Sequence, residues 1–108
     1  MSLIPHIEGV LSADEVVQTA ESIAALQLDN GMIPWFKDGH CDPWNHVETA
    51  IALDIAGLHN NAERAYEWLV DIQHTDGWWF NYYLPGGIVE EPKLDTNVCA
   101  YIAAGVWH

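Results

Sequence analysis

The sequence predicts an all-α fold of two helical hairpins, in which outer and inner helices alternate as in a segment of an α/α toroid. The first observation behind this prediction is the spacing of Gln73, Gly77 and Trp79, which ends an amphipathic helix with a glycine turn and an aromatic ring. The second is a copy of this step 46 residues earlier, at Gln27 and Gly31. The third is that half-polar helices alternate with nearly apolar ones. A repeated two-helix unit is typical of stacked α-hairpins.

The first predicted helix begins after Ser12 and ends near Leu28. Ser12 and Glu15 have the spacing of a capping box, in which each side chain accepts a hydrogen bond from the backbone of the other residue. Apolar residues recur on one face of this segment and polar residues on the other, so we expect an outer helix. The segment 29–31, which contains a glycine, then ends it.

The second predicted helix begins after Asp42 and runs to about Ala56. Asp42 is a favourable N-cap residue, and Pro43 suits the first helical position. Apolar residues cover most of the circumference of this helix, so we expect it to be buried on more than one side. The short turn over residues 57–61 forces the next helix to run antiparallel beside it.

The third and fourth predicted helices repeat this pair. The third spans about residues 61–74 and has a single apolar stripe, as an outer helix should. The fourth begins at Asp95 or Thr96, and residues 98–107 carry no charge, as expected of an inner helix.

These helices define two predicted repeats, at about residues 12–58 and 61–108, after an N-terminal extension of residues 1–11. A hairpin of a repeat architecture buries its inner face only against neighbouring repeats. We therefore expect a partial domain, completed either by the remaining repeats of a larger chain or by self-association of identical copies.

The charge of the chain is strongly negative. Three basic against sixteen acidic residues give a net charge of −13, which disfavours binding to nucleic acid and to anionic lipid. The acidic surface either keeps the protein in solution or attracts cations such as a divalent metal. Cys41 and Cys99 do not make a disulfide framework, and no signal peptide or membrane span occurs in the sequence, so we expect a cytoplasmic protein.

Two long loops, at about residues 29–41 and 75–94, are expected on the face where the inner helices begin. Long loops often carry function. Asn45 and Asn97 occupy like positions at the two inner-helix starts, where they either cap the loops or bind a polar group of a ligand. Aromatic residues crowd the same face, where they either plug the end of the fold or line a ligand pocket; they are Trp35, Phe36, Trp44, Trp78, Trp79, Phe80, Tyr82 and Tyr83.

The segment from Arg64 to Trp79 resembles the QW repeat of squalene and oxidosqualene cyclases, through Arg64, Ala65, Trp68, Leu69, Gln73, Gly77 and Trp79. Segments 42–57 and 94–108 are similar to bacterial prenyltransferase-like proteins. The resemblance is to the terpenoid cyclase and protein prenyltransferase superfamily of α/α toroids, and it implies an apolar or isoprenoid ligand at the aromatic face. The cyclases protonate an alkene with a DxDD-type acid, but Leu94 occupies the place of the proton-donating aspartate.

The same resemblance raises the question of a metal, because protein prenyltransferases bind zinc through Asp, Cys and His. His40, Cys41, Asp42 and His46 are of suitable type for Zn or Mg, although the family has Asp before Cys and this chain has the reverse. Asp42 is also explained as an N-cap residue.

A second enzyme class, the six-hairpin glycosidases, shares the toroid and needs two carboxyl groups about 5 Å apart for retention or about 6.5–9.5 Å apart for inversion. A third alternative is a non-catalytic repeat scaffold for protein contacts. The candidate catalytic residues are Asp42, Glu48 and Asp95, among further carboxylates at Asp38, Glu90 and Glu91. The candidate ligand-binding residues, for a small apolar or sugar ligand, are Trp35, Trp44, Asn45, His46, Trp78, Trp79, Tyr82 and Asn97.

Overall fold

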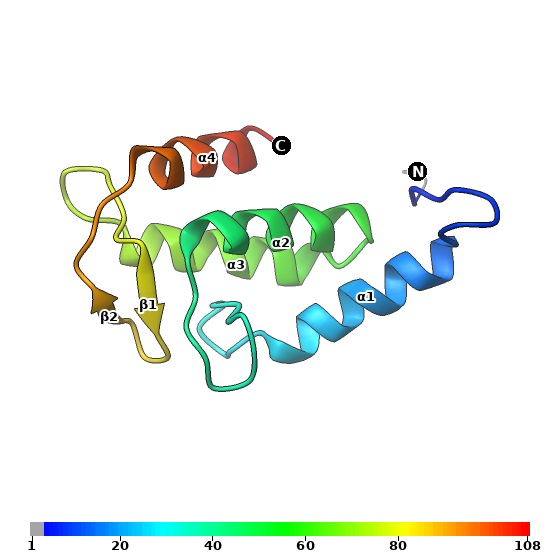
Figure 1. The fold of residues 1–108 in the computed structure, drawn as a ribbon, viewed down its shortest axis with the longest axis horizontal. Coiled ribbons are helices and arrows are strands. Elements are labelled where there is room, and N and C mark those ends of the chain that lie inside the picture. The colour runs from blue at the N-terminus through cyan, green and yellow to red at the C-terminus, as the bar shows by residue number, and fades with distance from the viewer. Residues whose placement is uncertain (1–3) are drawn as a thin grey trace.

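The computed structural model describes residues 4–108, apart from the side chain of Glu91, so residues 1–3 of the predicted N-terminal extension lie outside the described part. Four α-helices and one small β-hairpin form the fold (Figure 1): α1 (Ala13–Leu26), α2 (Pro43–Ile55), α3 (His59–Ile72), β1 (Tyr82–Leu84), β2 (Ile88–Glu91) and α4 (Thr96–Trp107). The prediction of an all-α segment of a toroid is confirmed.

Side-chain caps fix the starts of three helices, and the sequence predicts two of them, at Ser12 and Asp42. Ser12 Oγ accepts from the backbone of Glu15, and the Glu15 carboxylate accepts from the backbone of Ser12. Asp42 caps α2, with Pro43 at the first helical position, and Asp95 caps α4. In contrast, α3 begins at residue 59, two residues before the predicted start, and its first turn has no side-chain cap.

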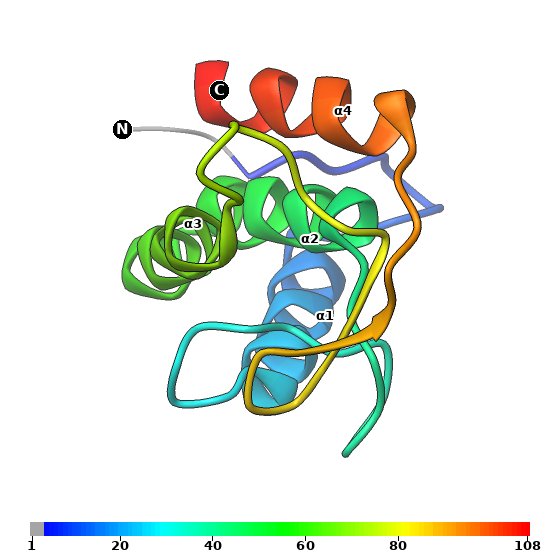
Figure 2. The same cartoon turned by 90° about the vertical axis from the view of Figure 1, so that its left-hand side faces the viewer.

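Helix α2 lies at the centre of the bundle. It packs against α1, α3 and α4, with α4 and α1 on opposite sides of it (Figures 1 and 2). One core cluster gathers the loops and α4 around Val47 and Trp68, and the other gathers α1 and α3 around Ala50 and Leu53. Helix α2 is therefore an inner helix, as its nearly continuous apolar surface predicts.

The repeated glycine turns after α1 and α3 have the same geometry. The Gln27 side-chain amide donates to the carbonyl oxygen of Gly31, and the Gln73 amide donates to that of Gly77, each at 3.0 Å. Both glycines have positive φ, +97° and +95°, which a residue without Cβ adopts readily. The sequence repeat is thus a structural repeat.

The hairpin corrects the prediction that residues 75–94 form a loop without regular structure. Strands β1 and β2 are antiparallel, with Tyr83 opposite Val89 and Leu84 opposite Ile88. Gly86 and Gly87, both at positive φ, make the turn between them. In addition, the backbone of Tyr83 exchanges two hydrogen bonds of 2.8 Å with that of Cys41. The two long loops therefore lie on one face, as predicted, and are joined there.

Candidate functional site

The joined loops bring several of the predicted aromatic side chains together. Trp35 packs edge-on against Tyr82, with ring centroids 6.3 Å apart, and edge-on against His40, at 4.4 Å. The side chains of Trp35 and Phe36 remain 49% and 58% exposed. This part of the rim is consequently an aromatic surface that solvent reaches.

Asp42 organises the start of α2 beneath this surface. Its Oδ2 atom accepts from the Trp35 indole N–H at 2.6 Å and from the Asn45 side-chain amide at 2.8 Å, while Oδ1 accepts from the Asn45 backbone at 2.9 Å. Asp42 itself is buried. Three donors thus occupy the carboxylate, and in this arrangement Asp42 positions Trp35 and Asn45.

The accessible face of the first two turns of α2 carries Trp44, Asn45, Glu48 and Thr49, which we call the α2 strip. Trp44 and Glu48 are four positions apart, and so are Asn45 and Thr49. Residues four apart lie one above the other on a helix, so the two pairs run side by side along one face. The Trp44 indole N–H donates to Glu48 at 3.1 Å. Asn45 and Glu48 are exposed, whereas Trp44 and Thr49 are half-buried. The strip therefore places a carboxylate and an amide side by side.

Tyr101 of α4 borders one side of the α2 strip. Its ring stacks on Trp44, with centroids 4.4 Å apart and planes 6° from parallel. Partial burial raises the pKa of Tyr101, and the charge and hydrogen bonding of Glu48 raise it further. Sequence reasoning missed Tyr101, although a phenol in a helix without charges is a signal that could have identified it.

A pocket of about 350 Å³, here the α1–α2 pocket, borders the other side of the strip. Trp35 forms one wall, and Asn45 and Thr49 supply polar groups. Its remaining lining is apolar: Ile23, Leu26, Ile33 and Pro34. Aromatic walls with a few convergent polar groups are typical of small-molecule sites. The predicted residues Trp35, Asn45, Trp44 and Glu48 are thus brought together around one helix end.

His46, in contrast, lies in the core. It is 1% exposed, accepts from the Ile33 backbone at Nδ1 (3.3 Å) and donates from Nε2 to the Ala65 carbonyl oxygen (2.8 Å). Burial lowers the pKa of His46 to about 4. The ring is therefore a neutral tether between the first loop, α2 and α3.

The predicted metal candidates are engaged in other contacts. His40 Nδ1 lies 3.2 Å from the Glu90 carboxylate, and Cys41 is buried, which raises the pKa of its thiol. Asp42 and His46 have the partners given above. Within residues 4–108, no group of three or more His, Cys, Asp or Glu residues is arranged to bind a metal ion. These four side chains do not fit a Zn or Mg site in this arrangement.

The other predicted residues lie apart from the α2 strip. Trp79 is buried, and its indole N–H donates to the Leu69 carbonyl oxygen at 2.8 Å. Trp78 stacks on His74, with centroids 3.8 Å apart. Asp95 and Asn97 are exposed at the start of α4, where Asp95 accepts from the Asn97 backbone.

The fold and the site together define an α-hairpin protein with an aromatic and carboxylate-bearing surface at the start of its inner helices. No known family profile matches the chain. The chain is, however, 44% identical over all 108 of its residues to the MMP endo-(1,4)-3-O-methyl-alpha-D-mannosidase of Mycolicibacterium hassiacum, of which it spans 30%. It is 32% identical over 74 residues, or 68% of its length, to an uncharacterized glycosyl hydrolase of Methanocaldococcus jannaschii, of which it spans 10%.

The relatives found do not support the resemblance to terpenoid cyclases and prenyltransferases. Both relatives bear the names of sugar-hydrolysing proteins. Six-hairpin glycosidases and the terpenoid cyclase superfamily share the α/α toroid, so the predicted fold class is unchanged. None of the helices in residues 4–108 has the length and apolar character that crossing a bilayer requires.

Proposed function

We propose that this chain is the sugar-binding part of a glycoside hydrolase and that the α2 strip contacts the sugar. The observation that carries the proposal is the arrangement of Asn45 and Glu48 between the Trp35 wall and the Trp44–Tyr101 stack. Sugar rings have apolar faces that suit aromatic rings and hydroxyl edges that suit amides and carboxylates. The relationship to a mannosidase over the whole chain supports the same class of ligand.

The substrate that we propose is an α-linked mannose oligosaccharide with methyl ethers on its hydroxyl groups. The mannosidase relative is named for a 3-O-methyl sugar. A methyl ether is apolar, and the α1–α2 pocket offers Ile23, Leu26 and Trp35 beside the amide of Asn45. Burial of a methyl group there contributes about 0.8 kcal/mol, which would favour the methylated sugar over the free one.

Among the predicted catalytic residues, we propose Glu48 for the proton-transfer role. Glu48 is exposed beside the ring of Trp44, whereas Asp42 is buried and holds three donors. Asp95 is exposed at the start of α4 and is the second candidate carboxyl group. A glycosidase needs two such groups on opposite sides of the scissile bond.

Tryptophan fluorescence titration with methylated and unmethylated mannose oligosaccharides tests the binding proposal, with a farnesyl analogue as comparison. We expect the methylated sugar to change the emission, and Trp44→Ala or Asn45→Ala to weaken its binding at least about tenfold, or 1.4 kcal/mol. Trp107→Ala is the matched control, because Trp107 lies at the far end of α4 and is 92% exposed. A response to the farnesyl analogue alone would refute the proposal.

Hydrolysis of the same oligosaccharides tests the role of Glu48. We expect Glu48→Gln to lower kcat by at least about a hundredfold, in the range typical of a lost general acid or base. The control is Glu67→Gln, which removes the same charge from the exposed face of α3. Unchanged hydrolysis in Glu48→Gln would assign the proton transfer to another residue.

A further inference from the structure

A second group of side chains adjoins Trp35 outside the α1–α2 pocket. It comes from the loop before α2 and from the β-hairpin, and we call it the hairpin surface: Phe36, His40, Tyr82 and Glu90. Trp35 packs against His40 and Tyr82 and also walls the α1–α2 pocket, which none of these four residues lines. The hairpin surface therefore continues the candidate site across one indole ring.

His40 lies at the centre of the hairpin surface. Its ring centroid is 4.4 Å from that of Trp35, 5.2 Å from that of Tyr82 and 6.0 Å from that of Phe36. One imidazole thus lies beside aromatic rings from both loops and joins them into a single surface.

Glu90 supplies a carboxylate to this surface. Its Oε2 atom lies 3.2 Å from His40 Nδ1, and its side chain remains 41% exposed. The carboxylate is therefore held by a neighbour and is still reached by solvent. Because an ionised carboxylate only accepts hydrogen bonds, a ligand that binds it must present N–H or O–H groups.

The loop that presents the aromatic rings is internally bonded. The Trp35 backbone N–H donates to the His40 carbonyl oxygen at 2.8 Å, and that of Gly39 donates to the Phe36 carbonyl oxygen at 2.9 Å. The Phe36 ring lies against Gly39, where a Cβ atom would stand 2.6 Å from it. The exposed rings are thus held in place before a ligand binds, which reduces the entropy that binding loses.

The hairpin surface and the α1–α2 pocket differ in chemistry. The pocket is lined mostly by apolar side chains, which suit a methyl ether. The hairpin surface has a carboxylate beside exposed ring faces, which suits a sugar unit that presents hydroxyl groups at its edge. A methyl ether has no hydrogen to donate to Glu90. The net charge of −13 also disfavours an anionic sugar.

We propose that the hairpin surface is a second sugar subsite, at which a neutral sugar unit lies on the exposed ring of Phe36 and donates hydroxyl hydrogen bonds to Glu90. This inference rests on the proposed function, because the neighbouring unit of the same oligosaccharide occupies the α1–α2 pocket. Trp35 lies between the two units and contacts both.

Isothermal titration calorimetry with the monosaccharide and the 1,4-linked disaccharide of 3-O-methylmannose tests the subsite. We expect the disaccharide to bind at least about tenfold more tightly, because only the disaccharide reaches Glu90 from the α1–α2 pocket. Glu90→Ala should lower the affinity for the disaccharide about tenfold, which is typical of a lost hydrogen bond to a charged group. It should leave the affinity for the monosaccharide unchanged.

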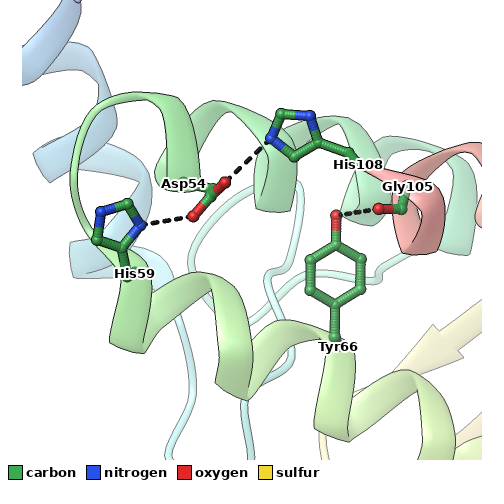
Figure 3. A network of polar contacts seen from close by, with 5 residues as sticks. All are labelled: Asp54, His59, Tyr66, Gly105 and His108. Carbon is green, nitrogen blue, oxygen red and sulfur yellow. Dashed lines mark hydrogen bonds and ion pairs between the residues drawn. The ribbon is translucent and has the colours of Figure 1, made fainter. Parts of the chain in front are cut away.

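The matched control removes the carboxylate from another histidine–carboxylate cluster. In the last turn of α2, Asp54 accepts from both His59 and His108 (Figure 3). Asp54→Ala removes one negative charge, as Glu90→Ala does, but at the opposite end of α2 from the candidate site. It should therefore leave both affinities unchanged.

A permethylated disaccharide separates hydroxyl recognition from other effects of Glu90. All of its hydroxyl groups are ethers, so it has no hydrogen to donate to the carboxylate. Glu90→Ala should therefore not lower its affinity. An equal loss for both disaccharides would refute hydroxyl recognition by Glu90.

Phe36→Ala tests the aromatic part of the subsite, and it replaces Glu90→Ala if circular dichroism shows that the latter disturbs the fold. Phe36 lies in the other loop and is 58% exposed, so its loss does not open the core. We expect Phe36→Ala to weaken binding of the disaccharide at least about threefold, as the loss of an aromatic contact does, and to spare the monosaccharide.

The two sugars also distinguish the failure of the subsite from the failure of the proposed function. A disaccharide that binds no more tightly than the monosaccharide would overturn the subsite. If Asn45→Ala still weakened binding of the monosaccharide, the proposed function would stand. No binding of either sugar would overturn both.

Discussion

Gly31 lies directly against the backbone of Arg64. A Cβ atom on residue 31 would overlap the Arg64 carbonyl oxygen and stand 2.8 Å from its carbonyl carbon. The Arg64 guanidinium in turn donates to the Leu28 carbonyl oxygen at 2.8 Å. The turn after α1 is therefore fixed on α3 in two ways, by the close approach of the two backbones and by the Arg64 side chain.

This contact predicts that alanine is tolerated differently at the two repeated glycines. Gly77 has nearly the same φ as Gly31, but the nearest atom to its Cβ position is 3.9 Å away. Gly77→Ala should therefore cost only the backbone strain of about 1–2 kcal/mol. Gly31→Ala adds a steric clash of roughly 1–3 kcal/mol. Urea denaturation of both variants measures the difference, and equal losses would contradict the contact.

His46 predicts a loss of stability in mild acid. Burial holds its folded pKa at about 4, below the ordinary value of 6.5, so the unfolded state binds the proton first. The free energy of unfolding should fall as the pH drops from about 6.5 to about 4, by at most about 3 kcal/mol, and be independent of this residue above that window. Urea midpoints across this range should fall less steeply for His46→Gln. Parallel profiles would show that His46 does not carry the effect.

Asp54 predicts a second pH dependence of the same sign. The hydrogen bond from His59, followed by that from His108, lowers the pKa of Asp54. Its stabilisation is present above the unfolded carboxyl pKa of about 3.9 and is lost as the pH falls through the lowered folded value. Because the side chain is 38% exposed, Asp54→Asn should cost about 1 kcal/mol or less near pH 6, and less in high salt. Asp71→Asn, which removes a carboxylate from the exposed face of α3, is the control for the loss of charge.

Local signals in the sequence predicted the helices well. The capping residues Ser12 and Asp42 each bond to the backbone three residues further along the chain. Such local contacts can be predicted from the sequence without knowledge of the fold. The sequence predicts the start of α3 two residues too late, because no capping side chain marks it. The hairpin was missed because Tyr83 is held partly by the backbone of Cys41, a contact between residues far apart in sequence.

The candidate site was predicted less completely, because burial depends on tertiary packing. His46 lies two residues before Glu48 on the same helix, yet it faces the Ala65 carbonyl oxygen while Glu48 faces solvent. Helical spacing separates these two faces but does not say which of them another helix covers. The role of Tyr101 likewise depends on how α4 packs beside Trp44.

The stack of Trp44 on Tyr101 predicts an energetic coupling between α2 and α4. Parallel aromatic pairs at this separation stabilise by about 0.5–1.5 kcal/mol beyond the area that they bury. Urea denaturation of Trp44→Ala, Tyr101→Ala and the double variant should give a coupling energy in that range. The same cycle between Trp44→Ala and Trp107→Ala should give none, because Trp107 is 92% exposed at the other end of α4. A coupling energy of zero between Trp44 and Tyr101 would contradict this prediction. The stack would then not stabilise the packing of α4 against α2 beside the α2 strip.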